Sequence, residues 1–159
     1  MYDSSRFERM PLLRPIIRSD STLWSGVDIE ETDEGGERWT LYYWVANTGK
    51  VPAYKLSYYH TLSTQDTIPP PNDSLFSKQW KQLVAFPGDV VECGYDQVLR
   101  QQVLDSFHVK RRYYRHFFLR FEDDMKTPYT YHSVWKLENY EPGKPPKFDL
   151  RGWRRLEID

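Results

Sequence analysis

The strongest hydrophobic pattern in the chain alternates with a period of two, which is the period of a β-strand. It lies in residues 38–47, RWTLYYWVAN. One row holds Trp39, Leu41, Tyr43 and Val45, and the other holds Thr40, Tyr42, Trp44 and Ala46. Because both rows contain aromatic side chains, this segment is predicted to be a central strand that is covered at least partly on both faces.

The alternation stops at the stretch NTGKVP, residues 47–52. The side chain of Asn47 can hydrogen-bond to backbone ahead of it, Gly49 supplies a turn conformation, and Pro52 has no N–H to donate to a strand ladder. The stretch therefore predicts a corner between two strands. The second strand is expected to begin at about Ala53 and to run to Ser63.

Shorter patterns predict the remaining strands. An extended segment is expected at 11–19, where Pro15 forbids a helix interior, and a strand at 22–32 before the glycine turn at 33–37. A Pro-Gly turn introduces a short strand within 86–95, and strands at 111–123 and 128–140 flank the turn DDMKT. Residues 74–83 fit a short helix as well as an edge segment.

One segment, near residues 96–108, has the spacing of a helix. Asp96 is a suitable N-cap residue, and apolar residues recur at helical spacing at Val98, Leu99, Val103 and Phe107. The sequence therefore predicts a helix inserted before the last strand hairpin.

The length of 159 residues suits one domain. Hydrophobic residues make up only 39% of the chain, but the aromatic share of 16% compensates, because each ring buries a large area and packs well on a sheet. We expect a flexible N-terminus at 1–10, a mainly β domain at 11–140 and a C-terminal tail at 141–159 packed on that domain.

Three stretches resemble a known domain type: VANTGKVPAYKLSYY at 45–59, FPGDVVEC at 86–93 and FLRFEDDMKTPYTYHSVW at 118–135. The first is similar to the Asn-x-Gly-x-x-Pro-Ala strand corner of bacterial uncharacterised proteins with an immunoglobulin-like β-sandwich. The others are similar to a Pro-Gly turn and to the closing hairpin of such domains. The resemblance covers roughly residues 38 to 138 and implies an all-β immunoglobulin-like sandwich of about seven strands. It carries over no catalytic or binding residue, and such domains commonly lie beside a membrane segment.

Charge and cysteine content narrow the classes of function. The net charge is −1 with both signs mixed along the chain, so composition gives no general attraction to nucleic acid or anionic membranes. The single cysteine, Cys93, excludes an intrachain disulfide and a multi-cysteine metal site. No apolar stretch approaches the roughly 18 residues of a membrane helix. We expect a soluble, cytoplasmic protein, or one that reaches a membrane through a segment outside this chain.

Catalytic motifs are absent from the sequence: it contains no phosphate-binding loop, no nucleophile elbow and no His-Glu-x-x-His. Asp123 and Asp124 are predicted to lie in a solvated hairpin turn. His60, His116 and His132 fall on strands predicted to be neighbours, but their positions allow two of them on one face rather than three. We therefore predict no enzyme activity, no metal site and no cofactor.

A basic stretch at 108–120 is the first candidate for a binding site. Its candidate ligand residues are Lys110, Arg111, Arg112, Tyr114, Arg115 and Arg120. Guanidinium groups bind phosphates through paired hydrogen bonds, and exposed rings stack on bases. This pattern favours a small phosphorylated ligand of the nucleotide type over nucleic acid. Alternatively, the arginine stems cover an aromatic sheet while their charges remain in water.

The C-terminal sequence RGWRRLEID repeats the pairing of arginine with tryptophan. If it folds back on the strand at 111–120, the two basic groups form one anion-binding patch. Alternatively, Arg154 and Arg155 pair with acidic residues such as Glu31 or Glu34.

Aromatic side chains on the outer rows supply the second candidate site. Tyr42, Trp44 and Phe118 are predicted to face outward together with Tyr114, and rings of this kind are enriched in protein interfaces. The sequence therefore predicts, first, a non-enzymatic interaction module that binds a protein partner or a second copy of itself. The alternative is a sensor domain for a small phosphorylated ligand.

Overall fold

The computed structural model describes residues 10–15, 27–32, 35–76, 84–139 and 146–156. The chain is mainly β, with 57% in strands, which confirms the predicted class. The described residues hold nine strands, against about seven predicted. The strands are β1 (Leu13–Pro15), β2 (Val27–Glu31), β3 (Glu37–Asn47), β4 (Ala53–Ser63), β5 (Val84–Ala85), β6 (Val90–Leu99), β7 (Tyr114–Glu122), β8 (Pro128–Asn139) and β9 (Lys147–Arg155), and the helices are α2 (Asp73–Phe76) and α3 (Arg100–Lys110).

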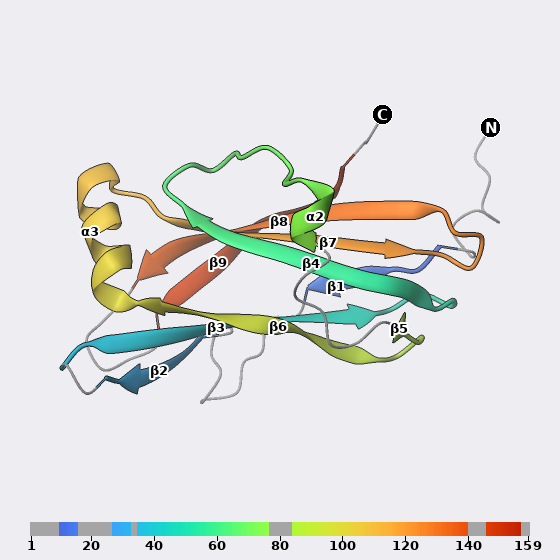
Figure 1. Ribbon diagram of the computed structural model, residues 1–159, viewed down its shortest axis with the longest axis horizontal. Helices are drawn as coiled ribbons and strands as arrows, with labels where there is room; N and C mark the ends of the chain where they lie inside the picture. The colour runs from blue at the N-terminus through green and yellow to red at the C-terminus, as the bar shows by residue number, and fades with distance from the viewer. Residues whose placement is uncertain (1–9, 16–26, 33–34, 77–83, 140–145, 157–159) are drawn as a thin grey trace.

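The strands form two sheets that lie one above the other (Figure 1). In the first sheet β3 is central: β1 and β2 pair with one edge of it and β6 pairs with the other, all antiparallel. The inner row of β3, which includes Trp39 and Tyr43, is buried in the core. Thr40 and Trp44 on the outer row are buried as well, so the prediction of a strand covered on both faces is confirmed.

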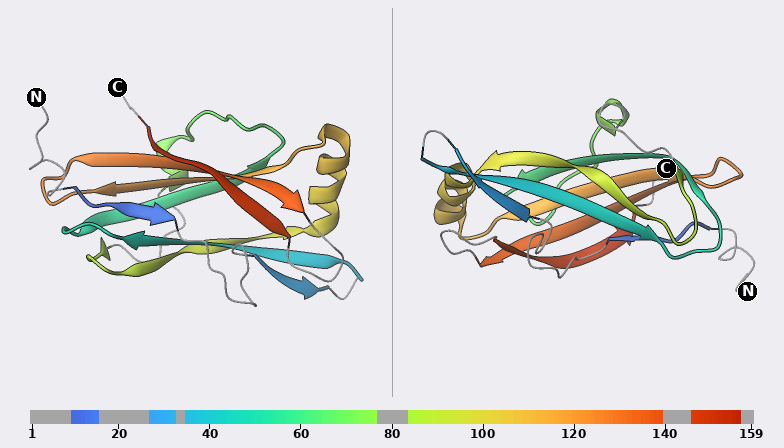
Figure 2. Two further views of the ribbon diagram at one scale, coloured as in Figure 1. Left: turned by 180° about the vertical axis from the view of Figure 1, so that it is seen from behind. Right: turned by 90° about the horizontal axis from the view of Figure 1, so that it is seen from below.

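The second sheet has the order β5-β4-β7-β8-β9, again antiparallel throughout. Its inner face contributes Leu56, Phe117, Leu119, Trp135 and Phe148 to the core between the sheets. The left view of Figure 2 shows the two sheets edge-on, with α3, which connects β6 to β7, at one end of the sandwich.

The predicted corner at residues 47–52 is confirmed, and β4 begins at Ala53 as expected. Asn47 is 1% exposed, and its amide nitrogen donates to the carbonyls of Val51 (2.8 Å) and Ala85 (2.9 Å). Its side-chain oxygen accepts the N–H of Gly49 (3.0 Å). A single side chain therefore ties the end of β3 to the approach of β4 and to β5.

Gly49 is required for a reason other than the one predicted. Its φ is not positive, so no left-handed turn demands glycine. Instead, a Cβ at this position would lie 2.9 Å from the backbone nitrogen of Leu12 and 3.1 Å from the carbonyl oxygen of Met10. Glycine is needed because the segment before β1 passes too close for any side chain.

The predicted helix start at Asp96 is wrong, because residues 96–99 continue β6. Gln97, Val98 and Leu99 pair with β3, and this pairing outweighs the local helical spacing. Helix α3 begins at Arg100 after Leu99, which makes no side-chain cap hydrogen bond. It ends at Lys110, and the next residue, Arg111, has a left-handed conformation (φ 61°) and donates its N–H to the Phe107 carbonyl.

The C-terminal segment is part of the sheet rather than a tail packed on it. Within 141–159, Lys147–Arg155 forms β9, which pairs with β8 over its whole length. Trp153 stacks on Tyr131 with ring centroids 5.0 Å apart, and its indole N–H donates to the carbonyl of Leu13 in the opposite sheet (3.0 Å). The boundary predicted at residue 140 therefore does not separate this segment from the domain.

Helix α2 covers the outer face of β4 and β7 (Figure 1). Its residue Phe76 contacts Tyr59 and Phe118, with ring centroids 6.5 Å away in each case. It accounts for the start of the ambiguous segment 74–83, of which residues 77–83 lie outside the described residues. Residues 1–9 of the flexible N-terminus predicted at 1–10 also lie outside them, whereas Met10 is buried. No helix in the described part of the chain has the length and apolar character to span a membrane.

Candidate functional site

A cavity of about 500 Å³ opens on the outer face of the second sheet, over β7, β8 and β9. It is lined by Asp66, Thr67, Tyr114, His132, Val134, Lys136, Arg151, Gly152 and Arg154. Its size lies within the range of small-molecule binding sites, which is about 300–1,000 Å³.

Strand periodicity explains why these side chains meet. On β8 the outward positions are His132, Val134 and Lys136, two residues apart. The register places His132 opposite Arg154 and Val134 opposite Gly152, and directly opposed residues of paired strands share a face. The loop that follows β4 contributes Asp66 and Thr67 to the cavity lining.

The cavity is cationic. Lys136, Arg151 and Arg154 contribute three positive charges, and Asp66 contributes the one carboxylate among the lining residues. Arg151 is paired with Glu138, which does not line the cavity, so the excess of positive charge there comes from Lys136 and Arg154. Arginine and lysine in a shared cavity are the groups that bind phosphates and carboxylates. The arrangement is therefore suited to an anionic ligand.

Glycine at position 152 keeps one side of the cavity open. A Cβ built there would meet no heavy atom within 4 Å. A larger residue at this position would therefore extend into the cavity without disturbing the strand.

One buried histidine, His132, lines the cavity, and a second, His116 on β7, is hydrogen-bonded to it. His132 is 2% exposed, and its ring is stacked on Phe118 with centroids 4.1 Å apart and planes 4° from parallel. Its Nε2 lies 2.9 Å from Nδ1 of the fully buried His116, whose Nε2 lies 2.7 Å from the carbonyl oxygen of Gln65. The histidines therefore link β8 through β7 to the loop that carries Asp66.

Burial keeps this pair uncharged. It lowers the pKa of His132 from 6.5 to about 4, with further lowering from the charges of His116 and Arg154. Burial also lowers the pKa of His116, although the Gln65 carbonyl and Asp66 act in the opposite direction. Both rings are neutral at pH 7.

Acid is expected to destabilise the fold through this pair. Between pH 6.5 and about 4 the unfolded chain protonates His132 while the folded chain does not, so stability falls as the pH is lowered through this window. The loss due to His132 amounts to roughly 3 kcal/mol. Urea unfolding as a function of pH measures it. His132→Phe should flatten this slope and His108→Asn, at an exposed position, should not; an unchanged slope in His132→Phe would contradict the assignment.

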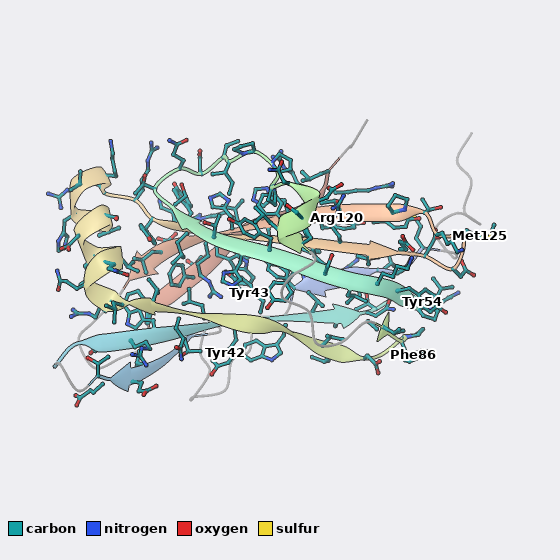
Figure 3. The ribbon with its side chains drawn as sticks, in the orientation of Figure 1. Tyr42, Tyr43, Tyr54, Phe86, Arg120 and Met125 are labelled. Carbon is teal, nitrogen blue, oxygen red and sulfur yellow. The ribbon has the colours of Figure 1, made fainter. Side chains whose placement is uncertain are left out.

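The predicted basic residues do not gather at this cavity. Of the six candidates, only Tyr114 lines it. Lys110, Arg111 and Arg112 are exposed at the end of α3 and just beyond it. Arg120 pairs with Asp73 (2.6 Å) and lies over the ring of Phe76, so it holds α2 on the sheet (Figure 3).

Arg115 is a core residue, 1% exposed, and the prediction that it binds a ligand is wrong. Its guanidinium lies 4.3 Å from the centroid of the Tyr43 ring and 5.2 Å from that of Phe148. It donates to the Tyr43 hydroxyl (3.1 Å) and to the Tyr42 carbonyl (2.9 Å). Because Arg115 faces inward from β7, it bridges the two sheets, and no ligand can reach it.

The predicted aromatic interface is also corrected. Tyr42 and Trp44 stack on each other on the first sheet, whereas Phe118 belongs to the second, so the three rings do not share one surface. Phe118 is fully buried beneath α2, against Tyr59 and His132. A partner could reach Phe118 only by displacing α2.

The remaining polar candidates take different positions. His116 and His132 share one face, as strand parity allowed, while His60 faces inward, where it stacks on Tyr58 and lies at a tilt to Tyr43. The prediction that Asp123 is solvated is wrong: it is 8% exposed and accepts hydrogen bonds within its turn, whereas Asp124 is exposed. No group of three potential metal ligands occurs among the described residues.

Sequence reasoning missed most of the cavity, although some signals were present. The alternation of His132, Val134 and Lys136 on β8 marks an outward row, and the C-terminal arginines had been noted as a second basic group. Neither signal shows that the loop at 65–67 closes over this face.

No family model, curated protein or solved structure matches the chain.

Proposed function

We propose that this protein is a non-enzymatic binding module for a small phosphorylated ligand, held in the cavity over β7, β8 and β9. The observation that carries the proposal is the convergence of Lys136, Arg151 and Arg154 on one small-molecule-sized cavity. Because Arg151 is paired with Glu138, the excess positive charge comes from Lys136 and Arg154 against Asp66. This excess favours an anion, and the planar guanidinium group of Arg154 suits phosphate oxygens.

Two further features support a ligand over a protein partner. Phe118, the centre of the predicted aromatic interface, is fully buried. The cavity is lined mainly by charged and polar side chains, including His132, whereas the centre of a protein interface is mostly apolar and aromatic. The ligand role is therefore proposed at β8 and β9 rather than along the predicted stretch at 110–120.

Isothermal titration calorimetry with adenosine 5′-monophosphate and inorganic pyrophosphate tests the proposal. Lys136→Ala and Arg154→Ala should each weaken binding about tenfold, the effect of losing one charge-assisted hydrogen bond. Gly152→Phe should abolish binding while leaving the melting temperature close to that of the parent, because its side chain enters open space.

Arg111→Ala and Arg112→Ala are the matched controls, since both remove an exposed arginine that does not line the cavity. They should leave the affinity unchanged. If they weaken binding more than Lys136→Ala and Arg154→Ala do, the ligand binds on the stretch at 110–120. If neither adenosine 5′-monophosphate nor pyrophosphate binds, the proposal that the cavity binds a phosphorylated ligand is wrong.

We also propose that the fold is an immunoglobulin-like sandwich. The orders β2-β3-β6 and β5-β4-β7-β8 correspond to the A-B-E and C′-C-F-G strands of that topology. β9 is then an added edge strand, and it supplies Gly152 and Arg154 to the cavity.

A further inference from the structure

The hydrogen-bonded chain below the cavity fixes which histidine nitrogens carry protons. A carbonyl oxygen can only accept, so His116 Nε2, 2.7 Å from the Gln65 oxygen, must carry a hydrogen. In the neutral ring His116 Nδ1 is then an acceptor. His132 Nε2, 2.9 Å away, must therefore carry the hydrogen that it donates to His116.

These assignments leave His132 Nδ1 without a proton. His132 lines the cavity, and no hydrogen bond to its Nδ1 occurs among the described residues. The residue is 2% exposed and lines the cavity, so this nitrogen is the acceptor that the ring of His132 can offer to a ligand there. The cationic cavity therefore has one hydrogen-bond acceptor at His132, fixed by the Gln65 carbonyl two residues away in the chain of bonds.

We propose that the ligand of this cavity is a phosphorylated molecule that also carries a hydroxyl or amino group, which it donates to His132 Nδ1. This inference rests on the proposed function and adds the second chemical group that the ligand must have. A ligand that covers this nitrogen without donating to it leaves the nitrogen without a hydrogen bond, which is costly. The phosphate itself binds to Lys136 and Arg154, so different residues bind the two ends of the ligand.

The pKa values agree with an acceptor at neutral pH. Protonation of His132 would convert Nδ1 into a donor, but burial and the charges of His116 and Arg154 hold its pKa near 4. The lowered pKa of His116 likewise keeps its Nδ1 able to accept from His132. The other charged groups near the pair are Asp66 in the loop and Lys136 on β8.

The first test is the protonation state itself, in the unliganded full chain. Long-range ¹H–¹⁵N correlation spectra of ¹⁵N-histidine-labelled protein distinguish a protonated from a bare ring nitrogen. Near neutral pH, His116 and His132 are both expected to be neutral with the hydrogen on Nε2. A hydrogen on Nδ1 of His132, or a charged ring, would overturn the inference without touching the proposal that the cavity binds anions.

The second test compares two probes that differ only in hydroxyl groups: ribose 5-phosphate and tetrahydrofurfuryl phosphate, which has the same ring and phosphate without the hydroxyls. Ribose 5-phosphate is expected to bind about tenfold more tightly. His116→Phe should remove much of this preference, because His132 is then no longer held in one tautomer. Gly152→Phe, as before, should abolish binding of both probes.

The outcomes separate the two proposals. Equal affinities that both depend on Lys136 and Arg154 would overturn the donor requirement and leave the anion site standing. No binding of either probe would overturn both. If His116→Phe fails to fold, the spectra and the probe pair measured on the parent protein still decide the question.

Discussion

Asn47→Asp is expected to lower the free energy of unfolding by about 4–5 kcal/mol, the largest effect of any substitution considered. The amide nitrogen of Asn47 donates to the carbonyls of Val51 and Ala85, at 2.8 and 2.9 Å, and the residue is 1% exposed. Aspartate has the same shape but would place an oxygen against both carbonyls and bury a charge. Two stabilising hydrogen bonds would become two repulsive contacts.

Equilibrium urea unfolding, followed by tryptophan fluorescence, measures this loss. Asn47→Ala removes the same two donations without adding a charge, so it should cost less than aspartate does. Lys50→Ala is the local control, because it alters an exposed side chain in the same corner and should change stability by less than about 0.5 kcal/mol. Similar values for Asn47→Asp and Lys50→Ala would show that the corner does not depend on the buried amide.

The corner also shows what could be predicted from the sequence. Asparagine and proline act on the backbone within a few residues, so the end of β3 and the start of β4 at Ala53 could be predicted from local chemistry. The period-two rows of β3 likewise placed Trp39 and Tyr43, which are both buried in the core, on one face. Even here the reason why position 49 requires glycine could not be predicted. A side chain there would clash with the backbone of Leu12 and Met10, which are distant in sequence.

The parts that could not be predicted all depend on contacts between distant segments. Pairing with β3 extends β6 through Leu99, although the local spacing favours a helix from Asp96. α2 covers Phe118, and the loop at 65–67 meets β8 and β9 to close the cavity. A pattern along one strand shows which face a residue occupies but not what lies over that face. Arginines that looked equivalent in the sequence therefore have different roles, with Arg115 in the core and Arg154 at the cavity.

Asp123→Ala is expected to cost about 4 kcal/mol, the second largest effect. One carboxylate oxygen accepts the N–H groups of Met125 and Thr127, both at 2.9 Å, and the other accepts the hydroxyl of Tyr129 at 2.9 Å. Hydrogen bonds to a charged group contribute about 1.5–3 kcal/mol each, and alanine leaves all three donors without this acceptor. The turn also holds Lys126 at a φ of 62°, a strained conformation for a residue other than glycine.

Asp124→Ala is the matched control, since it removes an exposed carboxylate from the next position of the same turn. It should change the unfolding free energy by less than about 0.5 kcal/mol. Asp123→Asn should fall between the two, because its carbonyl oxygen can still accept both backbone N–H groups while the Tyr129 hydroxyl can rotate to accept from the new amide. Equal losses of unfolding free energy for Asp123→Ala and Asp124→Ala would mean that Asp123 stabilises the turn no more than an exposed carboxylate does, as the sequence alone suggested. A large difference between them would show that Asp123 is buried and organises the β7–β8 hairpin.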